Sequence, residues 1–445
     1  MKTPIIDFVE SYAKNDFSRL HMPGHKGQSF LGCEKYDITE IDGADVLYSA
    51  DGIIKESEKN TSSLFGTVAS FYSTEGSSLC IKAMLSLICK GKKEKPLILA
   101  ARNVHKAFIY AAVLLDFDIK WMYSREENHL CSCLITPDEI KSYILECEKK
   151  PDAVYITSPD YLGKMWDIRS VSALCDRYNI PLLVDNAHGA YLAFTEDNMH
   201  PIKLGAAMCC DSAHKTLPVL TGGAYLHIGE KGKDFIPFAE DCLSLHSSTS
   251  PSYLIMQSLD LCNAYLADGY REKLAKTVTK IDLLKEKLLS LGFDVKESEP
   301  LKLTVSPLSF GYTGSELGEI LFDKKISCEF CDSEFAVMMF TPENSDKDFE
   351  RVSNAFSGIK KRKTKKTSCL PQLQKGEKKL SVREAFFSQW EQIDISEAEG
   401  KICATPAVSC PPAVPVAVSG ELISKNAVEI LAEYGIEKIS VVKIQ

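Results

Sequence analysis

The chain has 445 residues, 45% of them apolar, and a formal net charge of −9 at pH 7. This length supports a large core and more than one domain, and the acidic balance argues against nucleic acid or an anionic membrane as the main partner. No secretory signal opens the chain and no apolar run is long enough to span a bilayer, so neither secretion nor membrane insertion is expected.

In the first part of the chain, short apolar runs alternate with helical patterns. Residues 1–45 show little apolar periodicity and are predicted to form an N-terminal arm and linker. Over 46–255 the alternation predicts a large α/β domain with a mostly parallel sheet, and 79–88 is predicted to be helical. The strands expected in this domain are 97–100, 153–157, 182–185, 207–211 and 223–228.

The remainder is predicted to form smaller units. A long helical region begins at Pro251, and residues 256–358 are predicted to form a small α+β domain. Residues 359–374 are rich in lysine and arginine and are interpreted as a solvated linker, followed by a C-terminal domain over 375–445. The strands expected in the small domain are 302–305 and 337–340.

A lysine follows one of the predicted strands. Lys215 lies in Asp211-Ser212-Ala213-His214-Lys215-Thr216-Leu217-Pro218, directly after the apolar run 205–210. Open α/β folds bind ligands at the carboxyl edge of the sheet, where a desolvated lysine amine could attack a carbonyl group. A surface lysine in a loop is the competing interpretation.

An aspartate ends a neighbouring predicted strand. Asp185 follows Leu182-Leu183-Val184 and precedes Lys215 by thirty positions. The pair would suit pyridoxal phosphate (PLP), because a lysine can hold its aldehyde while a carboxylate keeps its pyridine nitrogen protonated. An aspartate that only caps the next turn is the alternative.

Two further segments could complete such a site. Gly76, Ser77 and Ser78 precede the predicted helix at 79–88, and the N–H groups and positive end of that helix would form an anion site. His105 follows the strand 97–100 and could lie flat on a cofactor ring, although a structural histidine is common at such a position.

In this order the segments resemble the Orn/Lys/Arg decarboxylase family of PLP enzymes over nearly the whole chain. The most distinctive match is His21-Met22-Pro23-Gly24-His25-Lys26-Gly27. The resemblance implies a large domain of the PLP-dependent transferase type (fold type I, like aspartate aminotransferase), with a small α+β domain and a C-terminal domain. The other matching segments are 37–40, 102–106, 184–190, 212–218, 248–253, 382–387 and the stretch from Pro411 to Glu421.

The resemblance implies roles for the residues at matching positions. Lys215 is expected to attach PLP, Asp185 to bind the pyridine nitrogen, and His105 to stack on the ring. Ala187 is expected on the opposite face of the ring, and His188 on the substrate side as a fourth catalytic residue. The phosphate contacts implied by the resemblance are Gly76, Ser77, Ser78, Ser212 and His214.

The implied reaction is the decarboxylation of a basic amino acid to a polyamine or polyamine precursor. Arginine is the favoured substrate, and lysine and ornithine remain possible. The distal cation of the substrate is expected to need an acidic pocket, to which Glu421 is one candidate contributor. The arm at 21–27 is expected to complete the active site at the interface of a homodimer or higher homo-oligomer.

Two alternative functions remain open. One is a PLP aminotransferase or another lyase of the same fold, and the other is a catalytically degenerate paralogue that acts as a binding or regulatory subunit. Residues that depart from the family pattern motivate the second alternative: Glu75, Asn186 where Glu is common, and Ser409-Cys410 where Tyr-Pro often stands. Gly222-Gly223 also depart from the pattern, since Gln and a neighbour are usual there.

Glu75 is a further departure, at a position where the family usually has Asn. A carboxylate beside the phosphate loop would repel the phosphate if it pointed inward. Glu75 is therefore expected to turn outward to a cation such as Lys82, His25 or Lys26, or to cap the start of the helix.

The sixteen cysteines are scattered along the chain. Cys328-Glu329-Phe330-Cys331 is a CxxC pair, but without a second pair it is weak evidence for zinc, and no metal site is expected. Reduced thiols in the cytoplasm are the simplest account of this cysteine content.

Overall fold

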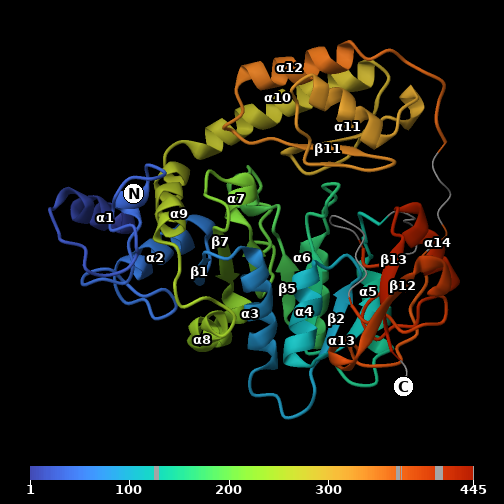
Figure 1. The fold of residues 1–445 in the computed structure, drawn as a ribbon, viewed down its shortest axis with the longest axis horizontal. Helices are drawn as coiled ribbons and strands as arrows, with labels where there is room; N and C mark the ends of the chain where they lie inside the picture. The colour runs from blue at the N-terminus through green and yellow to red at the C-terminus, as the bar shows by residue number, and fades with distance from the viewer. Residues whose placement is uncertain (125–129, 367–370, 372, 406–413, 444–445) are drawn as a thin grey trace.

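A seven-stranded sheet forms the centre of the structure, a computed structural model that describes residues 1–124, 130–366, 371, 373–405 and 414–443 (Figure 1). In the order β1-β7-β6-β5-β4-β2-β3, only β7 runs antiparallel to its neighbours, so the prediction of a mostly parallel sheet is confirmed. The strands are β1 (Ala69–Ser73), β2 (Leu97–Ala101), β3 (Asp118–Met122), β4 (Ala153–Thr157), β5 (Leu182–Asp185), β6 (Met208–Asp211) and β7 (Ala224–Ile228).

Both faces of this sheet are covered by hydrophobic residues. Successive residues of a strand point to opposite faces, so each strand contributes side chains to both. On β2, Ile98 and Ala100 belong to one hydrophobic cluster, and Leu99 and Ala101 belong to another. The first cluster includes residues of α2 (Ile53–Phe65), α3 (Ser77–Cys89), α4 (Lys106–Leu115) and α9 (Tyr253–Ala267). The second includes residues of α5 (Pro137–Leu145) and α6 (Ile168–Tyr178). Two short helices follow β6 and β7, namely α7 (Ala213–Thr216) and α8 (Ala239–Ser244).

The N-terminal segment contains a helix, α1 (Pro4–Lys14), where the sequence predicted an arm. Its apolar residues Ile5 and Val9 are buried within the first cluster, and α1 contacts both α2 and α9. The carboxylate of Asp260, on α9, accepts the N–H groups of Ile5 at 2.9 Å and Ile6 at 3.1 Å. A tertiary partner therefore satisfies the start of α1, where Thr3 makes no side-chain cap and the local signals are Pro4 and Asp7 in the first turn.

A smaller antiparallel sheet lies above the central sheet in the view of Figure 1. Its order is β10-β11-β9-β8, formed by β8 (Asp294–Lys296), β9 (Lys302–Ser306), β10 (Phe330–Cys331) and β11 (Ala336–Met339). The helices α10 (Tyr270–Ser290), α11 (Gly314–Asp323) and α12 (Asp346–Ser357) accompany it. The predicted helical region after Pro251 is thus two helices, α9 and α10, separated at Gly269, whose φ of 67° requires the left-handed region.

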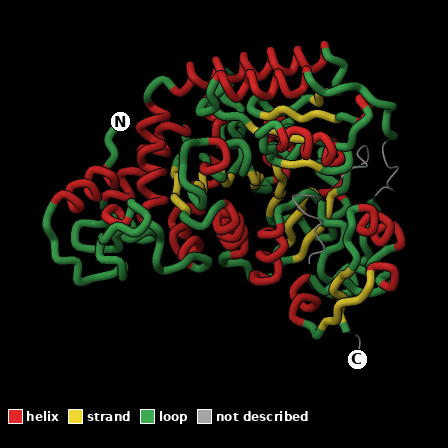
Figure 2. Tube along the Cα trace, turned by 45° about the horizontal axis from the view of Figure 1, so that its top comes forward, coloured by secondary structure: helices red, strands yellow, loops and turns green. Residues whose placement is uncertain are grey.

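The C-terminal part packs against the second hydrophobic cluster. Its paired strands β12 (Trp390–Asp394) and β13 (Lys438–Val442) accompany α13 (Val382–Phe387) and α14 (Lys425–Glu433). Ile430 and Val441 join Val154 of β4 in that cluster. The chain therefore begins and ends on opposite sides of the molecule (Figure 2).

The strands predicted from the apolar runs are present, with ends that agree to within a residue or two. Two strands of the large sheet were missed. β1 carries serines at Ser70 and Ser73, and the edge strand β3 alternates polar and apolar residues, so neither forms a continuous apolar run. The domain divisions at 255, 358 and 375 stay predictions. Among the described residues, no helix is long and apolar enough to cross a membrane.

Candidate active site

The predicted aspartate and lysine meet at the carboxyl edge of the large sheet. Asp185 is the last residue of β5, in register with Thr157 of β4 and Cys210 of β6. Lys215 lies in α7, the short helix that follows β6. The strand order therefore brings residues thirty positions apart to adjacent strand ends, which is where open α/β sheets bind ligands.

Lys215 is in contact with His188. The Nζ atom of Lys215 and the Nε2 atom of His188 are 2.9 Å apart. Burial lowers the pKa of Lys215, and the charges of Asp185 and Glu329 oppose that shift. Burial also lowers the pKa of His188, and the neighbouring cations Lys302 and Lys215 add to the effect. A lysine whose pKa is lowered by burial, beside an imidazole whose pKa is also lowered, is suited to nucleophilic chemistry.

Asp185 is 2% exposed and is held in one orientation by its neighbours. Its Oδ1 accepts the N–H of Ala187 at 3.2 Å and the thiol of Cys210 at 3.6 Å, and its Oδ2 accepts the hydroxyl of Tyr155 at 3.3 Å. A buried carboxylate so fixed can bind a positively charged ring nitrogen.

His105 caps the N-terminus of α4. Its Nδ1 accepts the N–H of Ala107 at 3.2 Å, which sets the orientation of the ring. Desolvation lowers the pKa of His105, Lys215 acts in the same direction, and Asp185 opposes both. His105 is still an exposed residue, so its ring is accessible to a ligand.

The predicted anion site lies at the N-terminus of α3. Gly76 adopts a φ of 72°, and in the described part of the chain no side chain caps this helix. The hydroxyl of Ser212 donates to that of Ser77 at 2.8 Å, which brings the loop before α7 to the start of α3. Ser78 is half-buried there, and the positive end of the helix favours an anion.

Gly222 and Gly223 lie beside the start of α3. The N–H of Gly76 donates to the carbonyl of Gly222 at 2.7 Å, and the Nδ1 of His214 lies 2.9 Å from the carbonyl of Gly223. Gly222 has a φ of 100°, and a Cβ atom there would lie 2.7 Å from the carbonyl oxygen of Thr74. A larger residue would push this segment away from the loop at Gly76.

Glu75 points away from the expected partners. Its Oε1 accepts the N–H of Ser248 at 2.6 Å, and the side chain is exposed. Among the described residues, Glu75 makes no ion pair with Lys82, His25 or Lys26, so those predicted contacts are wrong, whereas the predicted outward turn agrees with its exposed side chain. The carboxylate instead links the segment before α3 to the segment before α9. Its partner is a backbone N–H group far away in the sequence, so the local sequence could not identify it.

Glu421 does not contribute to the site. Its two carboxylate oxygens bind the guanidinium of Arg102 at 2.7 and 2.6 Å, and Arg102 is 1% exposed. The prediction that Glu421 lines a substrate pocket is therefore wrong, because a buried partner occupies both oxygens. The departure at Ser409-Cys410 lies outside the described residues.

Three residues that the sequence did not single out border the site. The ring of Tyr161 packs edge-on against His188, with 5.2 Å between centroids, and its hydroxyl donates to Glu329 at 2.8 Å. Lys302 of β9 is fully buried and donates to the carbonyl of Asp160 at 3.0 Å. Lys302 could have been noticed in the sequence, because a lysine at the start of an apolar strand is unusual. Glu329 carries no such signal, since it reaches the site only through the packing of the small sheet.

The arm at 21–27 makes its contacts close to its own end of the molecule. The Nε2 of His21 lies 2.7 Å from the hydroxyl of Tyr12, and the Nε2 of His25 lies 3.2 Å from Asp37. Figure 1 places this N-terminal region beside α1, on the far side of α9 from α7. The fold therefore does not bring the arm to Lys215 of the same chain.

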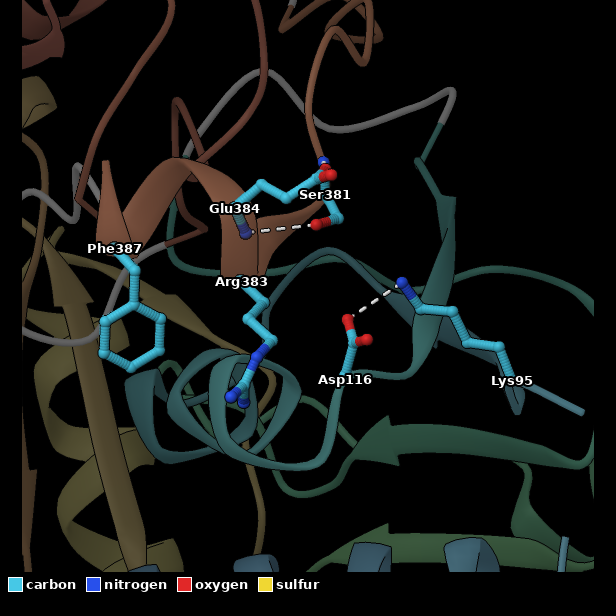
Figure 3. A pocket seen from close by; sticks show the side chains of 6 residues that line it. All are labelled: Lys95, Asp116, Ser381, Arg383, Glu384 and Phe387. Carbon is cyan, nitrogen blue, oxygen red and sulfur yellow. Dashed lines mark hydrogen bonds and ion pairs between the residues drawn. The ribbon is translucent and has the colours of Figure 1, made fainter. Parts of the chain in front are cut away.

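A hollow of about 490 Å³ lies elsewhere, between α13 and the end of α4 (Figure 3). Its charged side chains are bound within the protein: Lys95 to Asp116 at 2.9 Å, Arg383 to the carbonyl of Val113 at 2.8 Å, and Glu384 to the N–H of Ser381 at 2.8 Å. We therefore interpret this hollow as part of the interface between α13 and the region around α4, and not as a ligand site.

Comparison with known proteins finds family models and relatives that match most of the chain. Residues 3–304 match the family model "Orn/Lys/Arg decarboxylase, major domain", and residues 363–434 match "Orn/Lys/Arg decarboxylase, C-terminal domain". An arginine decarboxylase of Bacillus subtilis (strain 168) is 27% identical over 466 residues, covering 97% of this chain and 93% of the relative. The uncharacterized protein YaaO of the same strain is 28% identical over 458 residues, covering 97% and 94%.

A solved structure shares the fold. The lysine decarboxylase LdcF of Francisella novicida superimposes with a TM-score of 0.83 at 17% identity, covering 99% of this chain and 81% of that protein. A NifS-like protein superimposes with a TM-score of 0.53 over 68% of this chain. The predicted fold type I architecture is therefore confirmed.

Proposed function

Because the chain belongs to the Orn/Lys/Arg decarboxylase family, we propose that it is a PLP-dependent decarboxylase of a basic amino acid. The observation that carries the proposal is the contact of Lys215 with His188 at 2.9 Å, beside the buried carboxylate of Asp185. Arginine is the favoured substrate, since relatives covering most of the chain are named arginine decarboxylases, and lysine and ornithine are the alternatives.

The described residues fit PLP. The uncapped start of α3 at Gly76–Ser78, with Ser212 and His214 beside it, would hold the phosphate. Lys215 would attach the aldehyde, and Asp185 would bind the pyridine nitrogen. His105 and Ala187 would lie on the two faces of the ring. When bound, PLP supplies the electron sink that accepts the electrons of the carbon–carboxylate bond.

The side chains around PLP would orient the reacting groups and assist proton transfer. Burial and the neighbouring cations keep the pKa of His188 low, so its neutral Nε2 can accept a hydrogen bond from the Nζ of Lys215 and orient the amine. The carboxylate of Asp185, fixed by Ala187, Cys210 and Tyr155, would be positioned to bind the ring nitrogen. Tyr161 packs against His188 and limits its movement.

Glu329 is the residue that we propose for binding the distal cation of the substrate. It accepts a hydrogen bond from Tyr161, which packs on His188, and its charge raises the pKa of Lys215. The carboxylate is exposed and therefore accessible to an ammonium or guanidinium group. Glu329→Gln should raise KM for basic amino acids at least about tenfold, the loss of one charged hydrogen bond, with less effect on kcat. Glu319→Gln, an exposed change on α11, is the matched control.

The decisive experiment compares the wild-type protein with Lys215→Ala and with the surface control Lys233→Ala. The wild-type and control proteins should bind PLP so that borohydride fixes it covalently, and they should release carbon dioxide and an amine from arginine, lysine or ornithine. Lys215→Ala should do neither while remaining folded. A keto acid without carbon dioxide would instead support an aminotransferase, and PLP binding without turnover would support a degenerate paralogue.

We also propose a homodimer, or a higher oligomer built from it, in which the arm of one subunit completes the site of the other. The arm region exposes Leu20 (93%) and Leu31 (90%), and its contacts lie away from its own Lys215. The test mixes two inactive variants, Lys215→Ala and His25→Ala, and lets subunits exchange. Recovery of activity requires an arm acting across the interface, and no recovery would contradict the proposal.

The cysteines support a reducing compartment. Cys80 and Cys210 are fully buried free thiols, and burial raises the pKa of both. Buried protonated thiols need no oxidising environment. We therefore propose that the enzyme works in the cytoplasm.

A further inference from the structure

A second cluster of polar residues lies inside the large sheet, apart from Lys215 and His188. Cys209 and Asp211 lie two residues apart on β6, so their side chains share one face, and His227 of β7 is directly opposite Cys209 in the register. His200 comes from the segment that precedes β6. All four residues are 0% exposed.

The side-chain atoms of this cluster converge. The Oδ2 of Asp211 lies 3.0 Å from the Nε2 of His200 and 3.4 Å from the Nε2 of His227. The sulfur of Cys209 lies 3.8 Å from the Nε2 of His200 and 3.9 Å from the Oδ1 of Asp211. Metal–ligand bonds of roughly 2.0–2.3 Å in a tetrahedron give ligand separations of roughly 3.3–3.8 Å, so only small movements would be needed.

The neighbours orient these atoms toward one another. The Nδ1 of His227 lies 2.8 Å from the hydroxyl of Ser70, which directs Nε2 into the cluster. Within the described part of the chain, the one polar contact found for that Nε2 atom is its 3.4 Å approach to the Oδ2 of Asp211, inside the cluster. The amide of Asn186 donates to the Oδ1 of Asp211 at 2.7 Å. A histidine that binds metal commonly has its other ring nitrogen held by an oxygen in this way.

We propose that His200, Cys209, Asp211 and His227 form a structural site for one divalent metal ion, with zinc the best match to nitrogen, sulfur and carboxylate ligands. One thiolate and one carboxylate would balance the two charges of the ion, and the Cys209 proton would pass to solvent on binding. The ion would link β6 to β7 directly before α7, the short helix that carries Lys215.

Asn186 is consistent with such a site. A glutamate at this position, common in the family, would place a second carboxylate against Asp211 in a buried environment, where like charges repel strongly. The amide of Asn186 instead donates to Asp211 and holds it in place. The four ligands show neither a CxxC nor an HxxxH spacing, so sequence motifs gave no sign of them.

Full burial predicts how the ion would behave. Because none of the four ligands is exposed, the metal must enter during folding and should resist chelators in the native protein. The wild-type protein, expressed with zinc available and dialysed against EDTA, should retain about one zinc per chain by elemental analysis. Unfolding should release it to a colorimetric chelator.

Variants locate the site. Cys209→Ala and His227→Gln should each reduce the bound zinc severalfold, whereas Cys175→Ala, which removes another buried thiol, should retain it. Protein made with cobalt should show a sulfur-to-cobalt absorption band that Cys209→Ala lacks. Lys215→Ala should keep its zinc, so the result is independent of catalysis. Wild-type protein with no stoichiometric metal, or full metal in the Cys209→Ala/His227→Gln double variant, would overturn the proposal.

Discussion

Asp185 acts on the site through its charge as much as through its hydrogen bonds. Its negative charge raises the pKa of Lys215, while burial lowers it. Asp185→Asn keeps the size of the side chain and removes the charge. The pKa of Lys215 should then fall further, so the amine becomes neutral at a lower pH.

Two measurements check this prediction. In PLP-free protein, the midpoint for reductive methylation of Lys215 should move to lower pH in Asp185→Asn, with the exposed Lys233 in the same sample as the internal reference. With PLP, decarboxylation should fall on the order of 100-fold or more, as expected when a buried stabilising charge is lost. Turnover within a few-fold of wild type would exclude Asp185 as the partner of the pyridine nitrogen.

Glu75 leads to a different expectation from the one that its position in the sequence suggests. Because its Oε1 accepts the N–H of Ser248, the carboxylate already has a partner outside the start of α3. Glu75→Asn is therefore expected to change the dissociation constant for PLP by less than about threefold, or roughly 0.7 kcal/mol. The shorter side chain should lose the Ser248 contact and make the segment before α9 easier to cleave by protease, whereas Glu75→Gln should not. A tenfold gain in PLP affinity would show that repulsion does operate.

The helix α2 carries a buried carboxyl group that should make stability depend on pH. Burial raises the pKa of Glu58 to about 8 from its usual 4.5, although the N–H of Tyr72 donates to it at 2.9 Å and Lys55 lies 3.8 Å away. Between these two pKa values the folded protein holds a proton that the unfolded chain has lost. This group therefore stabilises the fold fully below pH 4.5, and its contribution is lost as the pH rises toward 8.

Glu58→Gln should remove that dependence, since Gln keeps an acceptor for the Tyr72 N–H. The free energy of unfolding, measured in urea at pH 5.5 and pH 8, should fall less between the two pH values in the variant than in the wild type. Glu56→Gln changes an exposed residue of the same helix and should behave like the wild type. Parallel curves for Glu58→Gln and wild type would mean that Glu58 is ionised in the folded state.

The C-terminal part is held to the large sheet by a buried ion pair. Arg102, directly after β2, binds both carboxylate oxygens of Glu421, donates to the carbonyl of Pro415 at 2.9 Å, and lies 4.7 Å from the ring of Trp121. Glu421 in turn accepts the N–H of Val418 at 3.0 Å. Such a pair is costly to break, because the remaining charge is left buried without a partner.

Glu421→Gln is therefore expected to lower the free energy of unfolding by about 3–5 kcal/mol in urea titrations. The double change Arg102→Met/Glu421→Leu should recover part of that loss, since no charge then remains buried. Lys378→Ala breaks an exposed pair with Asp118 between the same two parts of the molecule and should cost less than about 1 kcal/mol. Equal effects of the exposed and buried changes would contradict the proposed role of the ion pair.

Sequence patterns predicted a structural feature correctly where a single segment contains all the residues that define it. The strand that ends at Asp185 and the strand before Lys215 are short apolar runs, and their ends carry polar residues of a recognisable chemistry. Because parallel strands present their carboxyl ends at one edge, the meeting of these residues also followed from the pattern. The helix start at Gly76 was predictable for the same reason, as its signal is a glycine and two serines before an apolar helical pattern.

Contacts between distant segments were beyond the reach of those patterns. Glu75 could have bound several cations, but the packing of α9 placed the backbone of Ser248 within its reach. Glu421 was equally plausible as a substrate ligand until β2 brought Arg102 against it. The side-chain partner of a charged group depends on which groups the folded chain places within a few ångströms, and this depends on chain topology and packing rather than on neighbouring sequence.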